Sequence, residues 1–94
     1  MVKIEPNERR IYVQLEPVEE KKVGSLYVPD NHSERSRIGR VIATGDEATR
    51  YVPGDRVFMS FYSGVVTEFP QYGMLGDVHR IVREEEILGK LAEE

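Results

Sequence analysis

The side chains that could do catalysis or bind metal are few in this sequence and stand apart. The two histidines are His32, in a polar stretch near Asp30, and His79, which alternates with apolar residues. A structural zinc site needs about four ligands, and the chain has no cysteine to complete one. We therefore interpret His32 as solvated and His79 as lying on a strand surface, and we expect no metal site.

The serine, glycine and glutamate residues form no known catalytic motif either. Ser25 and Ser63 adjoin glycines, but neither lies in a Gly-x-Ser-x-Gly sequence. The glycines do not form a phosphate-binding loop with a lysine. Three consecutive glutamates, residues 84–86, point in different directions on a turn, which predicts a solvated acidic turn and no working carboxylate pair. The sequence thus predicts a protein that is not an enzyme and uses no cofactor.

Length and charge narrow the function classes further. The chain has 94 residues and a formal net charge of −4, which fits one small domain over residues 1–94. Nucleic acid is not an expected partner, because neutralising phosphates requires a basic surface. No apolar stretch approaches the roughly 20 residues that span a bilayer, and the N-terminus lacks the apolar core of a secretion signal. With no cysteine, we expect a cytoplasmic protein without membrane contact.

Short strands separated by turn signals are predicted along the chain, which indicates an all-β fold, a small antiparallel barrel or sandwich. An edge strand is expected before Pro6, because proline cannot donate to a ladder. Gly39 indicates a bulge or a close backbone approach, and Gly45 a turn. The expected strands are 1–5, 10–16, 38–45, 56–62, 65–69 and 78–82, with a turn at 52–55, a loop at 70–77 and an acidic or single helical turn at 83–86 leading into 87–91.

The strand at 10–16 is the first expected core element. It alternates between an apolar face and a mixed face. The apolar face, directed to the core, consists of Ile11, Val13 and Leu15, and the face directed outward consists of Tyr12, Gln14 and Glu16.

An apolar triplet, Leu26-Tyr27-Val28, stands inside a long charged loop predicted over residues 17–37. A loop of that length is usually functional or disordered. Exposed apolar side chains are unfavourable in water, so the triplet fits a segment that docks in a groove on another protein. The alternative is a short strand packed on the domain's own core. Local composition gives the two interpretations equal weight.

The order of these features resembles the GroES-type co-chaperonins, the ten-kilodalton chaperonin family, over nearly the whole chain. That family carries a proline, an alternating strand, a Gly-Gly-Ile-Val-Leu-Pro-Asp loop, a Gly-x-Val-x-Ala-x-Gly strand, a Val-x-x-Gly-Asp-x-Val turn and an acidic ending. The matching segments here are Pro6, Arg10–Val13, Gly24–Asp30, Gly39–Gly45, Tyr51–Val57 and Arg80–Leu88. Each motif alone is weak, but together, in this order, they are specific.

Two segments depart from the family pattern. Between Gly45 and Pro53 the family has a longer hairpin that roofs its dome, so we expect an open or thinly rimmed dome here. The segment from Gly64 to Gly76 is instead several residues longer and contains Phe69 and Tyr72. This surplus is expected to line the cavity or to pack at an interface.

The resemblance implies a β-barrel of the GroES-like type with a long mobile loop, assembled as a heptameric ring that caps an ATP-bound chaperonin and encloses unfolded substrate protein. The implied chaperonin-binding residues are Gly24, Ser25, Leu26, Tyr27, Val28 and Pro29, with Leu26 and Val28 as groove contacts. The family also pairs its N-terminal strand with the neighbour's C-terminal strand, which implies a subunit interface of Val2, Ile4 and Pro6 with Ile87, Leu88 and Leu91. The alternative function is a structural ring without a chaperonin partner.

Overall fold

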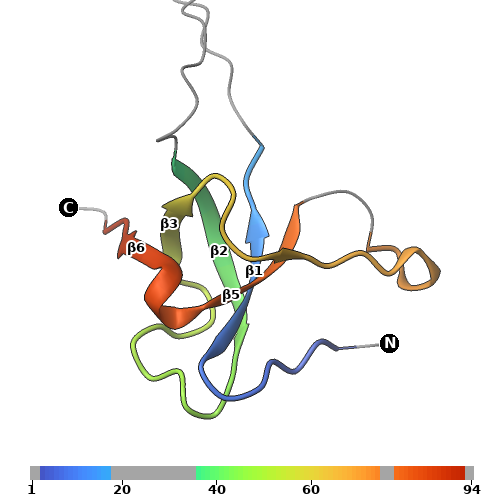
Figure 1. Cartoon of the computed structure of the whole chain (residues 1–94), viewed down its shortest axis with the longest axis horizontal. Helices are drawn as coiled ribbons and strands as arrows, with labels where there is room; N and C mark the ends of the chain where they lie inside the picture. The colour runs from blue at the N-terminus through green and yellow to red at the C-terminus, as the bar shows by residue number, and fades with distance from the viewer. Residues whose placement is uncertain (1–2, 18–35, 75–77, 93–94) are drawn as a thin grey trace, which may run out of the picture.

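Six strands form one antiparallel sheet in the computed structural model, which describes residues 3–17, 36–74 and 78–92 (Figure 1). Two single-turn 3-10 helices, Pro70–Tyr72 and Glu84–Glu86, complete the regular structure of the described residues, so the all-β prediction is confirmed. The strands are β1 (Arg10–Leu15), β2 (Ser36–Thr44), β3 (Arg56–Ser60), β4 (Val65–Val66), β5 (His79–Arg83) and β6 (Ile87–Lys90), in the spatial order β4-β5-β1-β2-β3-β6.

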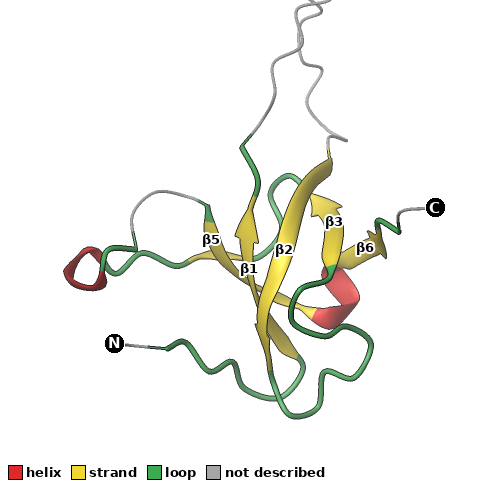
Figure 2. Cartoon of the chain, turned by 180° about the vertical axis from the view of Figure 1, so that it is seen from behind, coloured by secondary structure: helices red, strands yellow, loops and turns green. Residues whose placement is uncertain are grey.

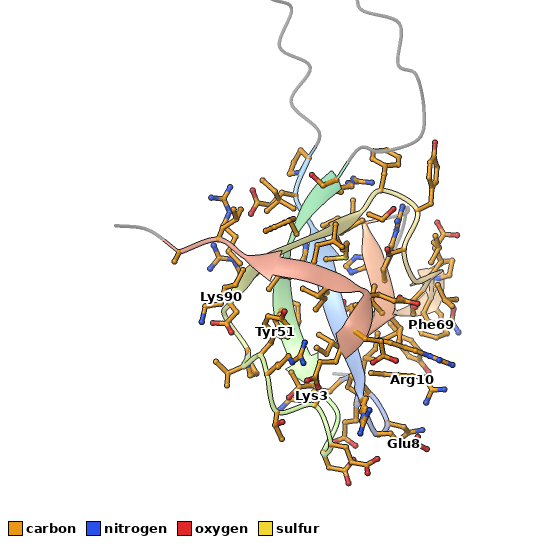
Figure 3. All side chains as sticks on the ribbon, turned by 60° about the vertical axis from the view of Figure 1, so that its left-hand side comes forward. Lys3, Glu8, Arg10, Tyr51, Phe69 and Lys90 are labelled. Carbon is orange, nitrogen blue, oxygen red and sulfur yellow. The ribbon has the colours of Figure 1, made fainter. Side chains whose placement is uncertain are left out.

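The sheet curls around one hydrophobic core, which gives the fold its barrel character. Val82 of β5 and Ile87 of β6, from opposite halves of the strand order, both belong to the core cluster. Ala48 and the half-buried Tyr51 pack on this cluster from the connection between β2 and β3 (Figure 3). The connection between β2 and β3 therefore covers part of the core. The other core residues are Ile11, Val13, Leu15, Val41, Val57 and Met59.

The outward face of β1 differs from the sequence-based prediction. Ile11, Val13 and Leu15 are buried as expected, but Tyr12 is also only 7% exposed. The pairing of β1 with β2 shifts register between Tyr12 and Val13, and Tyr12 packs against His79 on the neighbouring strand β5. Tyr12 thus begins a small second packing layer, which alternation along one strand cannot predict.

β2 begins at Ser36, two residues earlier than expected, so the end of the predicted loop 17–37 is wrong. Ser36 and Arg37 pair with Ser60 and Met59 of β3, and Arg37 is buried. A charged residue directly after a polar run looks like loop, although its long aliphatic stem can cover apolar surface. Gly39 provides the close approach that the sequence indicates, because an added Cβ would lie 3.1 Å from Leu15 Cδ2.

The expected N-terminal strand is absent from the described residues of this single chain. Residues 3–7 make no strand pairing, although Ile4 and Pro6 are half-buried while Lys3 and Glu5 are exposed. A strand needs a hydrogen-bonded neighbour, and β1 is already paired on both edges, with β2 and β5. Residues 3–6 therefore keep the alternating burial of a strand but form no backbone ladder with another strand of this chain.

The expected strand over 65–69 shortens to β4, two residues long. Beyond it, Phe69 bridges Met74 around the 3-10 turn, and Gly73 adopts φ 79°. Figure 2 shows this segment extending away from the barrel on the side where the N-terminal segment also lies. Phe69 and Tyr72 remain about half exposed, at 40% and 55%. Within the described parts of the chain, no helix is long and apolar enough to cross a membrane.

Candidate functional site

The residues that the sequence predicts for chaperonin docking, Gly24, Ser25, Leu26, Tyr27, Val28 and Pro29, lie outside the described residues. The structure describes the two residues that flank the segment of residues 18–35, Pro17 and Ser36, which we call its attachment points. Both lie at one end of the barrel, where β1 ends and β2 begins (Figure 1). The side-chain contacts at that end of the barrel therefore determine how the two attachment points are anchored.

The N-terminal attachment point is fixed by a two-pronged ion pair. Arg56 donates from Nε to Glu16 Oε2 at 2.7 Å and from Nη2 to Glu16 Oε1 at 2.8 Å. The backbone N–H of Glu16 also donates to Ile38 O at 2.8 Å. The hydrogen-bonded Arg56 guanidinium lowers the pKa of the Glu16 carboxyl below its ordinary value. Paired forks of this kind add geometric specificity, so the position of Glu16 at the end of β1 is well defined.

Near the C-terminal attachment point, two buried arginines contact the chain around Phe61. The guanidinium of Arg37 lies 5.5 Å from the centre of the Phe61 ring. Arg80 donates from Nη1 to Phe61 O at 2.5 Å and to Ser63 O at 3.2 Å. The turn after β3 is thereby held, and it presents Tyr62 with 76% of its surface exposed. This end of the barrel is cross-linked by side-chain contacts and carries an exposed aromatic ring.

The described residues of the predicted subunit interface fall into two groups. Ile4 and Pro6 are half-buried in the N-terminal segment, whereas Val2 lies outside the described residues. On β6, Leu88 is 62% exposed, and Leu91, just after the strand, is 37% exposed. The side chain of Ile87 instead belongs to the core, 5% exposed, so only its backbone is available to a neighbour. β6 pairs with β3 along one edge, and its other edge has no strand partner in the described chain.

The sequence predicts that His79 lies on the strand surface, but its ring shares a hydrogen bond with Tyr12. The hydroxyl of Tyr12 lies 2.8 Å from His79 Nδ1, and the two rings are tilted at 31° with centroids 6.0 Å apart. Burial raises the pKa of the Tyr12 hydroxyl, which therefore stays neutral. The pair joins β1 to β5.

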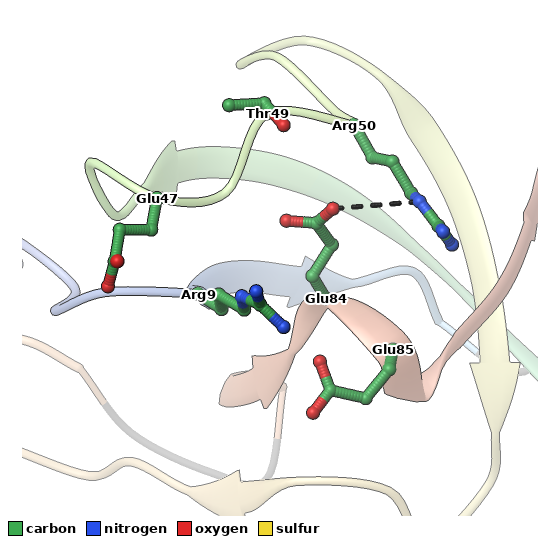
Figure 4. A pocket seen from close by; sticks show the side chains of 6 residues that line it. All are labelled: Arg9, Glu47, Thr49, Arg50, Glu84 and Glu85. Carbon is green, nitrogen blue, oxygen red and sulfur yellow. Dashed lines mark ion pairs between the residues drawn. The ribbon is translucent and has the colours of Figure 1, made fainter.

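A charged recess of about 320 Å³ lies between the start of β1, the connection after β2 and the turn before β6 (Figure 4). The predicted solvated acidic turn is wrong at Glu84, whose side chain is only 12% exposed. Arg50 covers it, with Nε 3.7 Å from Glu84 Oε1, and Glu85 lies on the opposite side of the recess. In the part of the chain that the structure describes, no three acidic or histidine residues are arranged to hold a metal ion. The residues that line the recess come from three separate elements.

Sequence reasoning missed the ion pair at Glu16 and the buried arginines, although a signal for the arginines is present. Arg80 is two residues before the buried Val82, and Arg37 is in the same alternating phase as Val41. Period-two alternation therefore places the side chains of both arginines on the core face of their strands. The partner of Glu16 lies 40 residues away and has no local signal.

The comparisons with known proteins agree with this arrangement. A family model described as the chaperonin 10 Kd subunit matches residues 3–91. The co-chaperonin GroES of Rhodothermus marinus is 36% identical, with 99% of this chain and 96% of the relative covered. That of Myxococcus xanthus is 33% identical over 94% of this chain and 96% of the relative, and that of Borreliella burgdorferi 31% over 99% and 100%. The barrel, its long insertion at one end and these matches together establish that the chain belongs to the chaperonin 10 Kd subunit family.

Proposed function

We propose that this protein is a co-chaperonin, a non-catalytic cap that docks on a GroEL-type chaperonin and encloses substrate protein while it folds. The observation that carries this function is the family match over residues 3–91, with the docking sequence Gly24–Pro29 inserted between β1 and β2. We assign the protein to the cytoplasm, with its chaperonin partner. No cofactor enters the proposed action.

The docking segment supplies modest binding free energy per subunit. Burying one aliphatic or aromatic side chain contributes roughly 1.5–3 kcal/mol, so Leu26, Tyr27 and Val28 together contribute several kcal/mol. Ordering each loop residue costs about 1–2 kcal/mol, which offsets much of this gain. One loop therefore binds weakly. A ring of loops binds tightly yet reversibly, because each further loop docks at high effective concentration.

The attachment points support this presentation. The Glu16–Arg56 fork and the Arg37–Phe61 contact hold both ends of the insertion on one end of the barrel. A rigid base fixes the direction of the loops, so less freedom is lost when several of them engage at once. The loops of all subunits in a ring then face the same way.

We propose that the ring is a heptamer in which the N-terminal segment pairs with β6 of the neighbouring subunit. Residues 3–7 keep a strand's alternation without a partner in their own chain, and β6 keeps one edge open. The contacts are Val2, Ile4 and Pro6 on one side and the backbone of Ile87 with Leu88 and Leu91 on the other. Deletion of residues 1–5 is expected to give monomers on a sizing column, and a retained ring would rule out this pairing.

The test of the docking function is ATP-dependent co-sedimentation with a GroEL-type chaperonin. The double variant Leu26→Ser with Val28→Ser is expected to lose binding, because it removes the groove contacts. Val18→Ser, in the same loop but outside the triplet, is the matched control and should bind normally. Equal binding of the double variant would refute the docking assignment. Absence of binding by the unmodified ring would favour the alternative, a structural ring without a chaperonin partner.

A further inference from the structure

The two ends of the curved sheet carry different exposed apolar residues. β4 and β6 are the outermost strands of the sheet, and Figures 1 and 2 place β6 on the side opposite the N-terminal segment. Figure 3 likewise places Phe69, beyond β4, and Lys90 of β6 on opposite sides of the body. Two unlike surfaces on opposite sides are what a closed head-to-tail ring requires.

The end near β4 contains a recess of about 340 Å³. Val65 of β4 pairs directly with Ile81 of β5, and both line the recess. Residues directly opposite on antiparallel strands share a face of the sheet. Val65 is 69% exposed although its neighbour Ile81 is only half-exposed. The apolar pair therefore forms an open seat on the outer face of the sheet.

Charged groups surround this apolar seat. Arg10 and Arg83, which pair with each other across β1 and β5, line the recess together with Glu86. The Glu86 carboxylate accepts a hydrogen bond from the backbone N–H of Arg83 at 3.3 Å. A recess lined by both apolar and charged side chains has the mixed composition of a protein contact surface.

The end near β6 presents a complementary side chain. Ile87 is directed into the core, so Leu88, the next residue, is directed to the outer face, where it is 62% exposed. An exposed leucine on an open edge strand favours aggregation unless a neighbour covers it. A leucine side chain is small enough to enter a recess of about 340 Å³.

We propose that Leu88 of one subunit inserts between Val65 and Ile81 of its neighbour. This inference rests on the ring assembly proposed above and adds a specific side-chain contact to its backbone pairing. The occupant is a second copy of this chain because the recess continues the proposed interface. Arg10 lines the recess, and Glu5 lies in the N-terminal segment proposed to pair with β6 of the neighbour. Arg10 is five residues after Glu5, so the recess is at most about 17 Å of chain away from that segment.

Adjacent valines on β4 provide a matched test. Val65 lies opposite Ile81, whereas Val66 lies opposite Arg80 and is directed to the other face. Both are exposed, at 69% and 47%, so serine at either position should leave the fold intact, as thermal unfolding of each variant will verify. The dissociation midpoint of the ring is measured by analytical ultracentrifugation over a dilution series.

Val65→Ser and Leu88→Ser are each expected to raise the dissociation midpoint about tenfold or more, because each removes one side of a buried apolar contact. The double variant should dissociate no more readily than Leu88→Ser alone, since Val65 has no further partner to lose once the Leu88 side chain is removed. Val66→Ser should stay within about twofold of the unmodified protein. Equal midpoints for Val65→Ser and Val66→Ser, or additive effects in the double variant, would overturn the inference.

The outcomes also separate this inference from the proposed function. A ring that forms normally in Val65→Ser but no longer binds the chaperonin would mean that the recess receives the chaperonin, which overturns the inference alone. A ring that depends on Val65 yet never binds a chaperonin overturns the docking function and supports the recess. An unmodified protein that stays monomeric at every concentration overturns both the ring and the recess.

Discussion

Replacing Gly45 by alanine should separate the N-terminal segment from the barrel. A Cβ at this position would overlap the carbonyl oxygen of Glu8 and lie 2.9 Å from the carbonyl carbons of Asn7 and Glu8. Carbon atoms pack at about 3.5–4.0 Å, so the two backbones must move apart by roughly 1 Å. Gly45 has no positive φ, and the whole effect therefore comes from crowding.

The cost follows from what that movement breaks. The N–H of Gly45 donates to Arg10 O at 2.9 Å, and the N–H of Glu47 donates to Glu8 O at 3.0 Å. Weakening these two hydrogen bonds and straining the backbone should lower the free energy of unfolding by about 2–3 kcal/mol. The assay is urea denaturation, with amide hydrogen exchange at residues 45 and 47. Ring dissociation should also become easier, because the displaced segment is the one proposed to reach the neighbour.

The control is Gly54→Ala, which tests strain without crowding. Gly54 has φ 100°, and an added Cβ would have no atom within 4 Å. Its cost should be about 1 kcal/mol, from the left-handed backbone alone, with normal exchange at residues 45 and 47. If Gly45→Ala retained full stability and slow exchange at both amides, the close approach of residues 7–8 to Gly45 would be refuted.

Three further predictions concern the ends of the strands. Arg56→Gln should lower the free energy of unfolding at neutral pH by about 0.5–1 kcal/mol. Because Arg56 lowers the pKa of Glu16, the stabilisation by this pair should be present above pH of about 4.5 and disappear as pH falls. Denaturation of both proteins across pH will check this. Tyr12→Phe should lower the free energy of unfolding by about 0.5–1.5 kcal/mol. Because burial raises the pKa of Tyr12 in the folded protein, the unfolded chain ionises first and the unmodified protein loses stability above pH of about 10. Tyr12→Phe should lose less stability in that range. Gly64→Ala should destabilise more than Gly73→Ala in thermal unfolding, because both have positive φ, at 83° and 79°, but only Gly64 has atoms within 4 Å of an added Cβ; equal losses would contradict this.

The fold could be predicted because its strands carry strong local patterns. Ile11, Val13 and Leu15 alternate with polar residues except at Tyr12, and turn residues separate the strands. The start of β2 is predicted two residues too late, because Arg37 directly follows a polar run, although its alternation with Val41 is a signal for the core face. An N-terminal edge strand is expected from alternation, but alternation cannot provide the hydrogen-bonded neighbour that a strand needs.

The attachment points of the docking segment were less predictable than the segment itself. Its residues form a compact motif in the sequence, whereas Glu16 and Arg56 meet only because β1 and β3 lie on either side of β2. Burial of Glu84 has the same origin, since Arg50 reaches it from a separate connection. Contacts between elements distant in the chain depend on register, which single-strand patterns do not determine.

Protection of substrate from protease tests the central claim, enclosure beneath a docked ring, most directly. A labelled unfolded protein is bound to a GroEL-type chaperonin, this protein and nucleotide are added, and proteinase K digestion is followed over time. The account predicts that the substrate becomes resistant to digestion with the unmodified protein and stays sensitive with the Leu26→Ser and Val28→Ser double variant. A substrate that is digested equally fast with and without the unmodified ring, although the ring is bound, would contradict enclosure.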